Sequence, residues 1–364
     1  MRLGLFMMPL HPPERPMHET LAENTEKSLL ADRLGFHELW IGEHFSASSE
    51  PIPSPLIFMA GLLPRTNLTF ATGVINMPNH HPAIVAAEVA QFDHMAQGRF
   101  IMGIGPGGLA SDWELFGNTD PAQRGKRMLA NMDTVLKIWN QDPPYDIEGA
   151  RITQAIIPEF GVGTMPKPYQ WPHPEIAITA RSVDSFGVRT AAERGWSVVS
   201  ANFVVERVVE GHWQTMSQAL AAAGKPVSGA SWRVGRNFCI AATDAEAEDR
   251  MLHADGANRY YFHYLSTLGR RAGQLATLKP QADTPDEAVT LEAIIRDCVM
   301  CGSPKTVLDR LIAFRDRVGP FGHLLMAGLD WSGPNAAWEA ETMKRLAEEV
   351  MPRFRQHVAA SAGK

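Results

Sequence analysis

The chain has 364 residues, of which 45% are hydrophobic and 20% are charged, and its formal net charge is -6. This length accommodates one large α/β barrel or two ordinary domains, and the composition is that of a globular protein with a large buried core. Lys and Arg are dispersed and no apolar stretch approaches the ~20 residues of a membrane span, so neither a nucleic-acid-binding face nor a transmembrane helix is expected.

Short β-rich runs alternate with segments whose apolar residues recur at helical spacing. This alternation predicts βαβ units and a parallel sheet, and eight strand–helix pairs favour a (β/α)8 barrel over an open doubly wound sheet. The predicted strands are residues 3–8, 38–44, 68–77, 99–104, 175–179, 197–201, 233–242 and 322–329. The predicted helices are one closed by Gly35, then residues 55–63, 83–95, 121–140, 183–194 and 204–223, one beginning at Asp244, and residues 303–318 and 335–354.

Two stretches interrupt this rhythm. Residues 145–171 follow the fourth strand, are rich in Pro and Gly, and are expected to form loops with a hairpin. Residues 255–290 follow the seventh strand, and we expect a partly mobile insertion there. No repeat or low-complexity linker separates the chain into parts, so residues 1–364 are predicted to form a single domain.

The N-terminal segment and the cysteines bear on the compartment. Gly4 and Pro9 interrupt the apolar run at residues 3–10, and no small-residue cleavage site follows, so we interpret the run as a strand and not a signal peptide. Cys298 and Cys301 form a C-x-x-C motif without a second pair, and Cys239 stands apart. Neither a disulfide framework nor a metal site is expected, and the cytoplasm is the simplest location.

In barrel enzymes the reacting groups lie on loops at the carboxyl ends of the strands. His44 ends the second strand, where it could be a proton donor, a base or a structural hydrogen-bond partner. Gly73, at the end of the third strand, would let the backbone approach a flat ligand closely. His80 and His81 follow, and because adjacent histidines in a turn diverge, a surface or helix-capping role is favoured over metal binding.

Two further strand ends carry motifs. Gly103-Ile104-Gly105-Pro106-Gly107-Gly108 has the spacing G-x-G-x-x-G, but residues 109–117 are predicted to form a loop over a cofactor, so a dinucleotide-binding Rossmann site is disfavoured. Residues 180–185 combine an Arg, hydroxyl groups and a helix N-terminus, which suits a phosphate monoester. The alternative is that Ser182 only caps the helix.

Several short motifs occur in a consistent order along the chain: Gly4-Leu5-Phe6, Gly35-Phe36, Glu43-His44, Asp93-His94-Met95, Gly98-Arg99-Phe100 and Ala191-Ala192-Glu193-Arg194-Gly195. Together they resemble the bacterial-luciferase-like family of flavin-dependent oxidoreductases over nearly the full length. The run Gly105-Pro106-Gly107-Gly108, followed by Ser111-Asp112-Trp113-Glu114-Leu115-Phe116-Gly117, resembles its limonene and alkanal monooxygenase branch.

The resemblance implies an FMN site and assigns residues to it. His44 matches the catalytic histidine beside the isoalloxazine ring, and Gly73-Val74 matches a non-prolyl cis peptide against that ring. The remaining matches are Asp112 and Arg124, which line the flavin, and Ser182 and Ser185, which bind its phosphate.

Two positions depart from the luciferase α-subunit. Phe45 replaces a second histidine, which argues against light-emitting aldehyde oxidation. Pro106 replaces a phosphate-binding arginine, and we infer that Arg181 supplies the missing positive charge.

The implied activity is a two-component monooxygenase reaction. A separate NAD(P)H-dependent flavin reductase provides reduced FMN, which reacts with O2 to a flavin hydroperoxide that oxygenates a small hydrophobic, terpenoid or similar, substrate. Residues 112–118 and 255–285 are expected to form lids, with Met7, Met8, Phe45 and Phe58 as candidate pocket walls or plain core. A homodimer is expected from the resemblance.

Three alternatives remain open. The same fold would serve a deazaflavin-dependent dehydrogenase or reductase, or a non-catalytic flavin-binding subunit like the luciferase β-subunit. A metal-dependent barrel hydrolase would need His and carboxylate residues converging from several strand ends, and the sequence offers only isolated ones.

Overall fold

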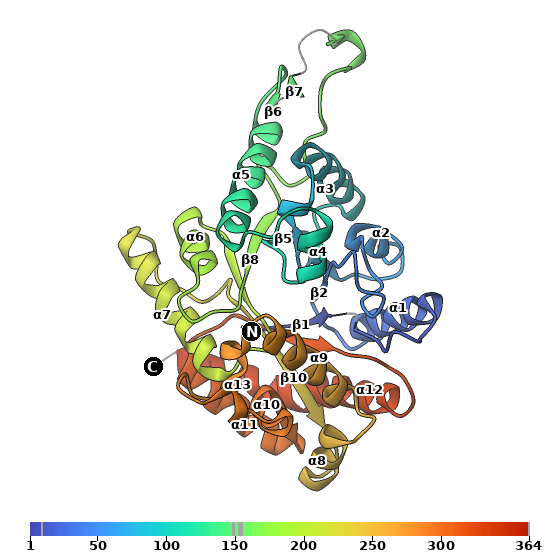
Figure 1. Cartoon of the computed structure of the whole chain (residues 1–364), viewed down its shortest axis with the longest axis vertical. Helices are drawn as coiled ribbons and strands as arrows, with labels where there is room; N and C mark the ends of the chain where they lie inside the picture. Colours follow the sequence, from blue (N-terminus) through green and yellow to red (C-terminus); the bar gives the residue numbers. More distant parts are fainter. Residues whose placement is uncertain (9, 148–149, 152–155, 363–364) are drawn as a thin grey trace. The chain divides into compact units, whose positions relative to one another are not determined.

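The computed structural model describes residues 1–8, 10–147, 150–151 and 156–362, and Figure 1 labels its elements. The strands are β1 (Arg2–Met7), β2 (Glu38–Ile41), β3 (Thr69–Thr72), β4 (Ile75–Asn76), β5 (Phe100–Gly105), β6 (Asp146–Ile147), β7 (Ala150–Arg151), β8 (Glu175–Ala180), β9 (Ser197–Ser200), β10 (Arg233–Ile240), β11 (Val299–Gly302) and β12 (His323–Gly328). The α-helices are α1 (Met17–Arg33), α2 (Pro55–Ala60), α3 (Pro82–Ala96), α4 (Ala110–Leu115), α5 (Pro121–Asn140), α6 (Phe186–Arg194), α7 (Glu206–Ala222), α8 (Asp244–Leu252), α9 (Ala257–Arg271), α10 (Leu291–Cys298), α11 (Pro304–Val318), α12 (Asn335–Arg345) and α13 (Met351–Ala362). Shorter helical turns are η1 (Met77–Asn79), η2 (Pro158–Phe160), η3 (Leu275–Leu278), η4 (Asp286–Ala288) and η5 (Leu346–Val350).

The principal sheet is a closed parallel barrel. Its strands are ordered β11-β10-β12-β1-β2-β3-β5-β8-β9, and a further pairing between β9 and β10 closes it. The eight predicted strands correspond to β1, β2, β3, β5, β8, β9, β10 and β12, so the predicted (β/α)8 fold is confirmed.

Contacts within the chain define two compact units. Unit 1 comprises Met1–Trp40, Ser49–Pro51 and Ile178–Lys364, and unit 2 comprises Ile41–Ser48 and Ile52–Ala177. A single domain over residues 1–364 therefore stays a prediction. No helix among the described residues has both the length and the apolar character needed to cross a bilayer.

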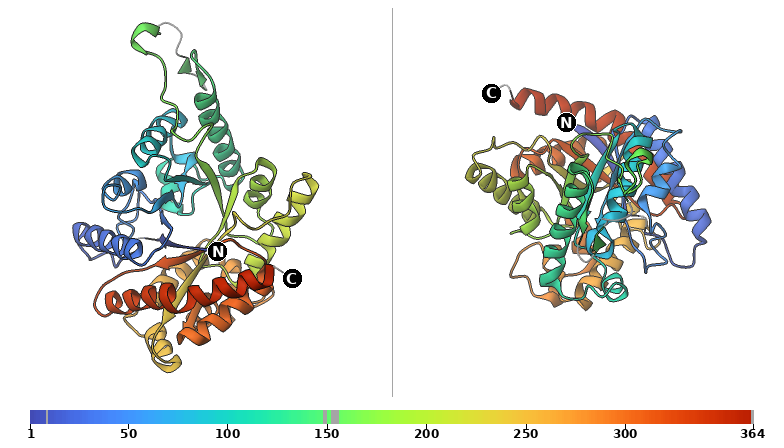
Figure 2. Two further views of the ribbon diagram at one scale, coloured as in Figure 1. Left: turned by 180° about the vertical axis from the view of Figure 1, so that it is seen from behind. Right: turned by 90° about the horizontal axis from the view of Figure 1, so that it is seen from above.

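In unit 1, the two halves of β10 have different neighbours. Residues 233–236 pair with β12, residues 233–234 also pair with β9, and residues 237–240 pair with β11. Strand β12 also pairs with β1 over six residues. Strand β11 was not predicted, because it is only four residues long and directly follows a helix. Helix α13 passes close to the N-terminus in both views of Figure 2, and its Arg355 Nε donates to the Met1 carbonyl oxygen at 3.1 Å.

A buried charge cluster joins the amino-terminal ends of β2, β10 and β12. Glu38 accepts hydrogen bonds from Arg233 at 2.8 and 2.9 Å, and its carboxylate lies 2.9 Å from His323 Nδ1. Trp40 Nε1 donates to the same carboxylate at 2.9 Å. Burial alone would raise the pKa of Glu38, but the hydrogen bonds and positive charges of His323 and Arg233 outweigh it and hold that pKa well below its usual range. The amino-terminal face of a barrel serves stability, and this cluster lies there.

Unit 2 is held by aromatic packing. Phe92 on α3 packs edge to face against Phe70 and Phe100, with ring centroids 6.2 and 5.1 Å away. Helix α5 packs beside α3, where Trp139 Nε1 donates to the Ala86 carbonyl oxygen at 3.0 Å. These contacts fix the two strands, β3 and β5, whose carboxyl ends carry candidate site residues.

Two segments predicted as loops contain helices. Residues 109–117 include α4, and the insertion at residues 255–290 includes α9. In each case the local sequence does not predict a helix, and packing against the rest of the protein stabilises it. Asp112 of α4 and Tyr261 and Phe262 of α9 are all buried. The predicted hairpin within residues 145–171 is present as the antiparallel pair β6–β7, whereas residues 148–149 and 152–155 lie outside the described residues.

Candidate active site

His44 lies three residues beyond β2 and is oriented by a buried carboxylate. Its Nδ1 is 3.0 Å from Asp112 Oδ2, and the two side chains are 14% and 2% exposed. Burial alone would raise the pKa of Asp112, but hydrogen bonds from His44 and Ser46 outweigh it and lower that pKa. An ionised carboxylate only accepts, so Nδ1 of His44 carries the proton and Nε2 is the nitrogen whose protonation can change.

The other oxygen of Asp112 binds the backbone that follows His44. The amides of Phe45 and Ser46 donate to Asp112 Oδ1 at 3.2 and 2.9 Å, and Ser46 Oγ donates to it at 2.5 Å. One carboxylate on α4 therefore fixes both the imidazole and its chain segment. The family resemblance predicts Asp112 beside a flavin, which stays a prediction, and it gave no signal for Ser46.

The turn after β3 contains the next predicted pair. The Gly73–Val74 peptide is cis, which is the geometry expected from the family resemblance. Gly73 N donates to the Ile41 carbonyl oxygen at 2.6 Å, and Thr72 Oγ1 donates to the Gly103 carbonyl oxygen at 2.8 Å. The turn is thus tied to its neighbours on both sides, whereas contact of Gly73 and Val74 with a flavin stays a prediction.

Arg124 and Trp113 stack beside the loop after β5. The guanidinium carbon of Arg124 lies 3.5 Å from the centre of the Trp113 ring, and Arg124 donates to the carbonyl oxygens of Asn118 and Thr119 at 3.3 and 3.1 Å. Gly107 lies close to the indole nitrogen at φ +85°, where a Cβ atom would be 3.1 Å from Trp113 Nε1.

Substituting Gly107 by Ala is expected to lower the free energy of unfolding by about 1–2 kcal/mol from the left-handed backbone, plus the cost of displacing Trp113. Urea unfolding of both variants measures this, with Gly117→Ala as the matched control. Gly117 has φ +67° and nothing within 4 Å of its Cβ position, so it incurs the backbone cost alone. Equal losses in the two variants would contradict the role of the Trp113 contact.

The candidate phosphate site lies in unit 1, between β8 and α6. Ser185, not Ser182, caps α6, because its Oγ accepts from Val188 N at 3.4 Å. Ser182 and Arg181 are exposed, and Arg181 Nη2 donates to Gln274 Oε1 at 3.3 Å. The helix therefore begins three residues later than predicted, which leaves the Ser182 hydroxyl outside the cap.

A buried histidine holds this loop in place. His212 Nε2 donates to the Ser182 carbonyl oxygen at 2.9 Å, and its Nδ1 accepts from Ser200 Oγ at 2.8 Å. Burial lowers the pKa of His212 to about 4, so the ring is neutral at pH 7 and can do both. Sequence reasoning missed His212, since an isolated histidine within a helix carries no motif.

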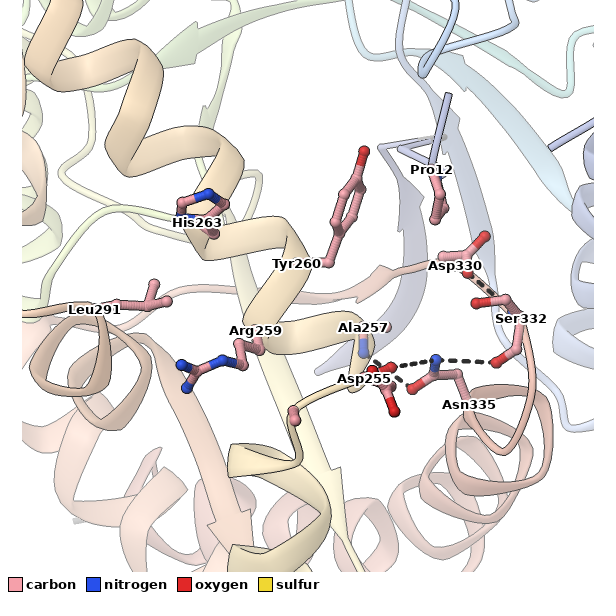
Figure 3. Close-up of a pocket in the computed structure, with 11 residues that line it drawn as sticks. Pro12, Asp255, Ala257, Arg259, Tyr260, His263, Leu291, Asp330, Ser332 and Asn335 are labelled. Carbon is pink, nitrogen blue, oxygen red and sulfur yellow. Dashed lines mark hydrogen bonds between the residues drawn. The ribbon is translucent and has the colours of Figure 1, made fainter. Parts of the chain in front are cut away.

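A cavity of about 500 Å3 lies elsewhere in unit 1 (Figure 3). Pro12 and Asp330, which follow β1 and β12, line one wall, and Tyr260 of α9 lines the wall opposite. Asp330 is fixed by His11 Nδ1 at 2.5 Å and by Arg15 Nη1 at 2.7 Å. Burial alone would raise the pKa of Asp330, but those hydrogen bonds and one from Ser332 outweigh it and hold it well below its usual range.

Helix α9, which forms a wall of this cavity, is held by hydrogen bonds along its length. Its partners all lie in unit 1: Asn335 Oδ1 accepts from Ala257 N at 2.9 Å, Tyr260 donates to the His11 carbonyl oxygen at 3.2 Å, Asn202 donates to Tyr261 at 2.9 Å, and Tyr264 donates to Glu50 at 2.7 Å. The cavity wall is therefore an anchored helix. Sequence reasoning singled out the aromatic residues of this segment but missed their hydrogen-bonding role.

Within unit 2 the structure brings His44 and Asp112 together, and within unit 1 it places Arg181, Ser182 and Ser185 on one loop. The predicted helix-capping role holds for His81, whose Nδ1 accepts from Ala83 N at 3.2 Å. It fails for His80, which pairs instead with Glu43. All three cysteines are free and buried.

Residues 1–319 match the family model described as luciferase-like monooxygenase. The chain is 30% identical to 4-hydroxyprotoasukamycin monooxygenase of Streptomyces nodosus subsp. asukaensis, over 96% of this chain and 91% of that protein. It is 28% identical to limonene 1,2-monooxygenase of Rhodococcus erythropolis, over 96% of this chain and 86% of that protein. Among solved structures, the oxygenating constituent of 3,6-diketocamphane monooxygenase from Pseudomonas putida, a type II Baeyer–Villiger monooxygenase in complex with FMN, matches with a TM-score of 0.84 and 26% identity, covering 97% of this chain and 98% of that one.

Proposed function

Because the chain belongs to the luciferase-like monooxygenase family, we propose that it is an FMN-dependent monooxygenase that transfers one oxygen atom from O2 to a small hydrophobic substrate of terpenoid type. The observation that carries this proposal is the His44–Asp112 pair, in which a buried carboxylate orients an imidazole just beyond β2. Barrel enzymes place their reacting groups at this end of the strands, and an oriented imidazole can transfer a proton there.

The side chains present fit FMN. In unit 2, Trp113 Nε1 and Asn79 Nδ2 are buried donors without a hydrogen-bond partner among the described residues, and Arg124 adds a positive charge beside Trp113. Such donors suit the acceptor atoms of an isoalloxazine ring. In unit 1, Arg181, the Ser182 hydroxyl and the N-terminus of α6 suit a phosphate monoester.

Reduced FMN, when bound, supplies the two electrons with which O2 yields one oxygen atom for the product and one for water. Asp112 keeps the proton on Nδ1 of His44, so Nε2 gives a proton to, or takes one from, the reacting oxygen atoms. Phe45, the residue that follows His44, packs edge to face on Phe116, with 4.9 Å between ring centroids. A phenyl ring next to His44 in place of a second imidazole favours oxygenation without light emission.

We also propose two protein partners. Reduced FMN comes from a separate NAD(P)H-dependent reductase, in keeping with the name of the Pseudomonas relative as an oxygenating constituent. A second copy of this chain covers the outer face of α2 and α3, where Ile57 and Ile84 are 77% and 53% exposed. Light scattering is expected to give the mass of a dimer, and Ile57→Glu to give that of a monomer; an unchanged mass in the variant would remove this face from the interface.

The test of function combines the purified chain with FMN, NADH, a generic flavin reductase and a panel of cyclic ketones and terpenes under ¹⁸O2. We expect a product that contains one ¹⁸O atom, and we expect it to form only when the chain, the flavin and oxygen are all present. Turnover with a reduced deazaflavin under nitrogen would instead identify a dehydrogenase or reductase. Flavin binding without any product across the panel would favour the non-catalytic subunit.

A further inference from the structure

Glu43 and His44 are consecutive residues, and each belongs to a histidine–carboxylate pair. His44 Nδ1 lies 3.0 Å from Asp112 Oδ2, while both oxygens of the Glu43 carboxylate lie 3.0 Å from His80 Nε2. The two pairs therefore share a single peptide unit, the one that joins residues 43 and 44. The first pair belongs to the proposed function, whereas the second has no role in it.

The backbone on either side of His44 is held by these two carboxylates. Asn76 clamps the preceding residue, because its side-chain amide donates to the Glu43 carbonyl oxygen at 3.0 Å and its backbone N donates to Glu43 Oε1 at 3.0 Å. Asp112 holds the following residues through the amides of Phe45 and Ser46. A change in the Glu43 side chain would therefore move the backbone that carries His44.

His80 provides the positive partner that a carboxylate at this depth needs. Glu43 is 4% exposed, and a buried carboxylate stays ionised only when it is paired and hydrogen-bonded. The His80 side chain is 22% exposed and is itself held, since its ring lies 5.5 Å from that of Phe45 and Asn131 Nδ2 donates to its carbonyl oxygen at 3.2 Å. The Glu43–His80 pair therefore connects the segment after β2 to the turn after η1, and further contacts hold it in place.

We propose that Glu43 and His80 are positioning residues for His44: their ion pair, together with Asn76, fixes the chain segment from which the His44 imidazole projects. This inference rests on the proposed role of His44 and adds a second carboxylate–histidine pair to the machinery that orients it. Outer hydrogen-bond partners that orient metal-binding histidines typically account for about a 10- to 100-fold effect on activity, and we expect an effect of similar size here.

The charge of His80 makes this positioning depend on pH. Burial alone would lower the pKa of His80, but its hydrogen bond to Glu43 and the negative charges of Glu43 and Glu88 outweigh burial and raise that pKa. The groups that act on His80 are Glu43 from the end of β2, Glu88 from α3, and the uncharged Phe45 and Asn131. A raised histidine pKa means that His80 keeps its positive charge to a higher pH, and the ion pair is lost as pH rises through the folded-state pKa of His80.

The decisive experiment follows the His44 imidazole by NMR in protein labelled with ¹³C-histidine, with the His44 resonance assigned by its absence from His44→Ala. In His80→Asn and in Glu43→Gln, the His44 resonance is expected to shift and its titration midpoint to move, because the segment is no longer fixed. His81→Asn is the matched control, since His81 is the exposed neighbour that caps α3 and an asparagine keeps the capping acceptor. It is expected to leave the His44 resonance unchanged.

Turnover provides the second readout. We expect kcat of His80→Asn to fall about tenfold or more while the Kd for FMN changes less than about twofold. We also expect the activity of the native chain to fall as pH rises through the raised pKa of His80, and this fall to be absent from the variant. If His80→Asn matches His81→Asn in both the His44 resonance and kcat, the proposal is overturned. Because the NMR readout needs no substrate, a shifted His44 resonance in a chain that forms no product would reject the monooxygenase function and retain the positioning role. Glu43→Gln, which keeps the size of the side chain, decides the question if His80→Asn folds poorly.

Discussion

The variant His44→Ala is expected to form oxygenated product roughly 10²- to 10⁴-fold more slowly than the native chain, the range that a positioned acid–base group contributes. Asp112 is ionised, keeps Nδ1 protonated and aims Nε2 at the reacting atoms, so alanine removes the proton carrier and its orientation together. Reduced flavin would still be oxidised, with hydrogen peroxide released in place of product. Parallel measurement of ¹⁸O in the product and of peroxide separates the two outcomes.

The variant Asp112→Asn tests whether Asp112 sets the tautomer of His44. An asparagine keeps the shape of the side chain but can donate to Nδ1, which favours the wrong tautomer of His44. We expect most of the His44→Ala loss in this variant too, whereas His18→Ala, at an exposed histidine of α1, serves as the control. Turnover of His44→Ala at the native rate would remove His44 from the chemistry.

The variant Glu38→Ala is expected to lower the free energy of unfolding by about 3–5 kcal/mol, the cost of removing one partner from a buried ion pair. Arg233 is 2% exposed, so without Glu38 its charge would remain buried and lose two hydrogen bonds. Denaturant unfolding of native and variant chains measures the difference. Asp309→Ala is the matched control, because its pair with Lys305 is mostly exposed and a surface pair is worth about 1 kcal/mol or less.

The same cluster predicts how stability responds to acid. Hydrogen bonds and positive charges hold the pKa of Glu38 well below its ordinary value, so its contribution is complete above pH ~5 and is lost as pH falls through the folded-state pKa. The stability gap between the native chain and Glu38→Gln should therefore be widest near neutral pH and narrow in acid. A gap that is constant from pH 7 to pH 3 would show that the charge of Glu38 does not matter.

The barrel strands could be predicted because each is buried on both faces and appears in the sequence as a short β-rich run between helical segments. Residues 233–242 illustrate the limit of that signal. The run marks one strand correctly, but only the structure shows that its first half pairs with β12 and its second half with β11. Partner choice depends on contacts between segments about 60 to 90 residues apart, which periodicity does not record.

In the candidate site, too, the sequence predicts some features and only the structure shows the others. His44, Asp112 and the cis Gly73–Val74 peptide could be predicted from the sequence, because they belong to motifs that occur in a consistent order along the chain. The contacts that orient His44 were not, because Asp112 acts from a helix predicted as a loop and Glu43 acts through His80, 37 residues further on. Hydrogen-bond partners of a functional residue leave no spacing rule in the sequence, so they become visible only in the folded chain.

Helix α9 carries two kinds of residue: buried ones that attach it to unit 1 and exposed ones that line the cavity. Tyr261 and Phe262 are at most 1% exposed and attach the helix to unit 1, whereas Arg259 and His263, one turn apart, are exposed along the cavity. Figure 3 shows Arg259 on the side of α9 toward Leu291 and Tyr260 on the side toward Pro12 and Asp330. Substitutions at Tyr261 and Phe262 are expected to destabilise the fold, whereas substitutions at Arg259 and His263 are expected to change mainly the surface of the cavity. On a helix divided in this way, the residues that face the cavity can change without altering the contacts that attach the helix to unit 1.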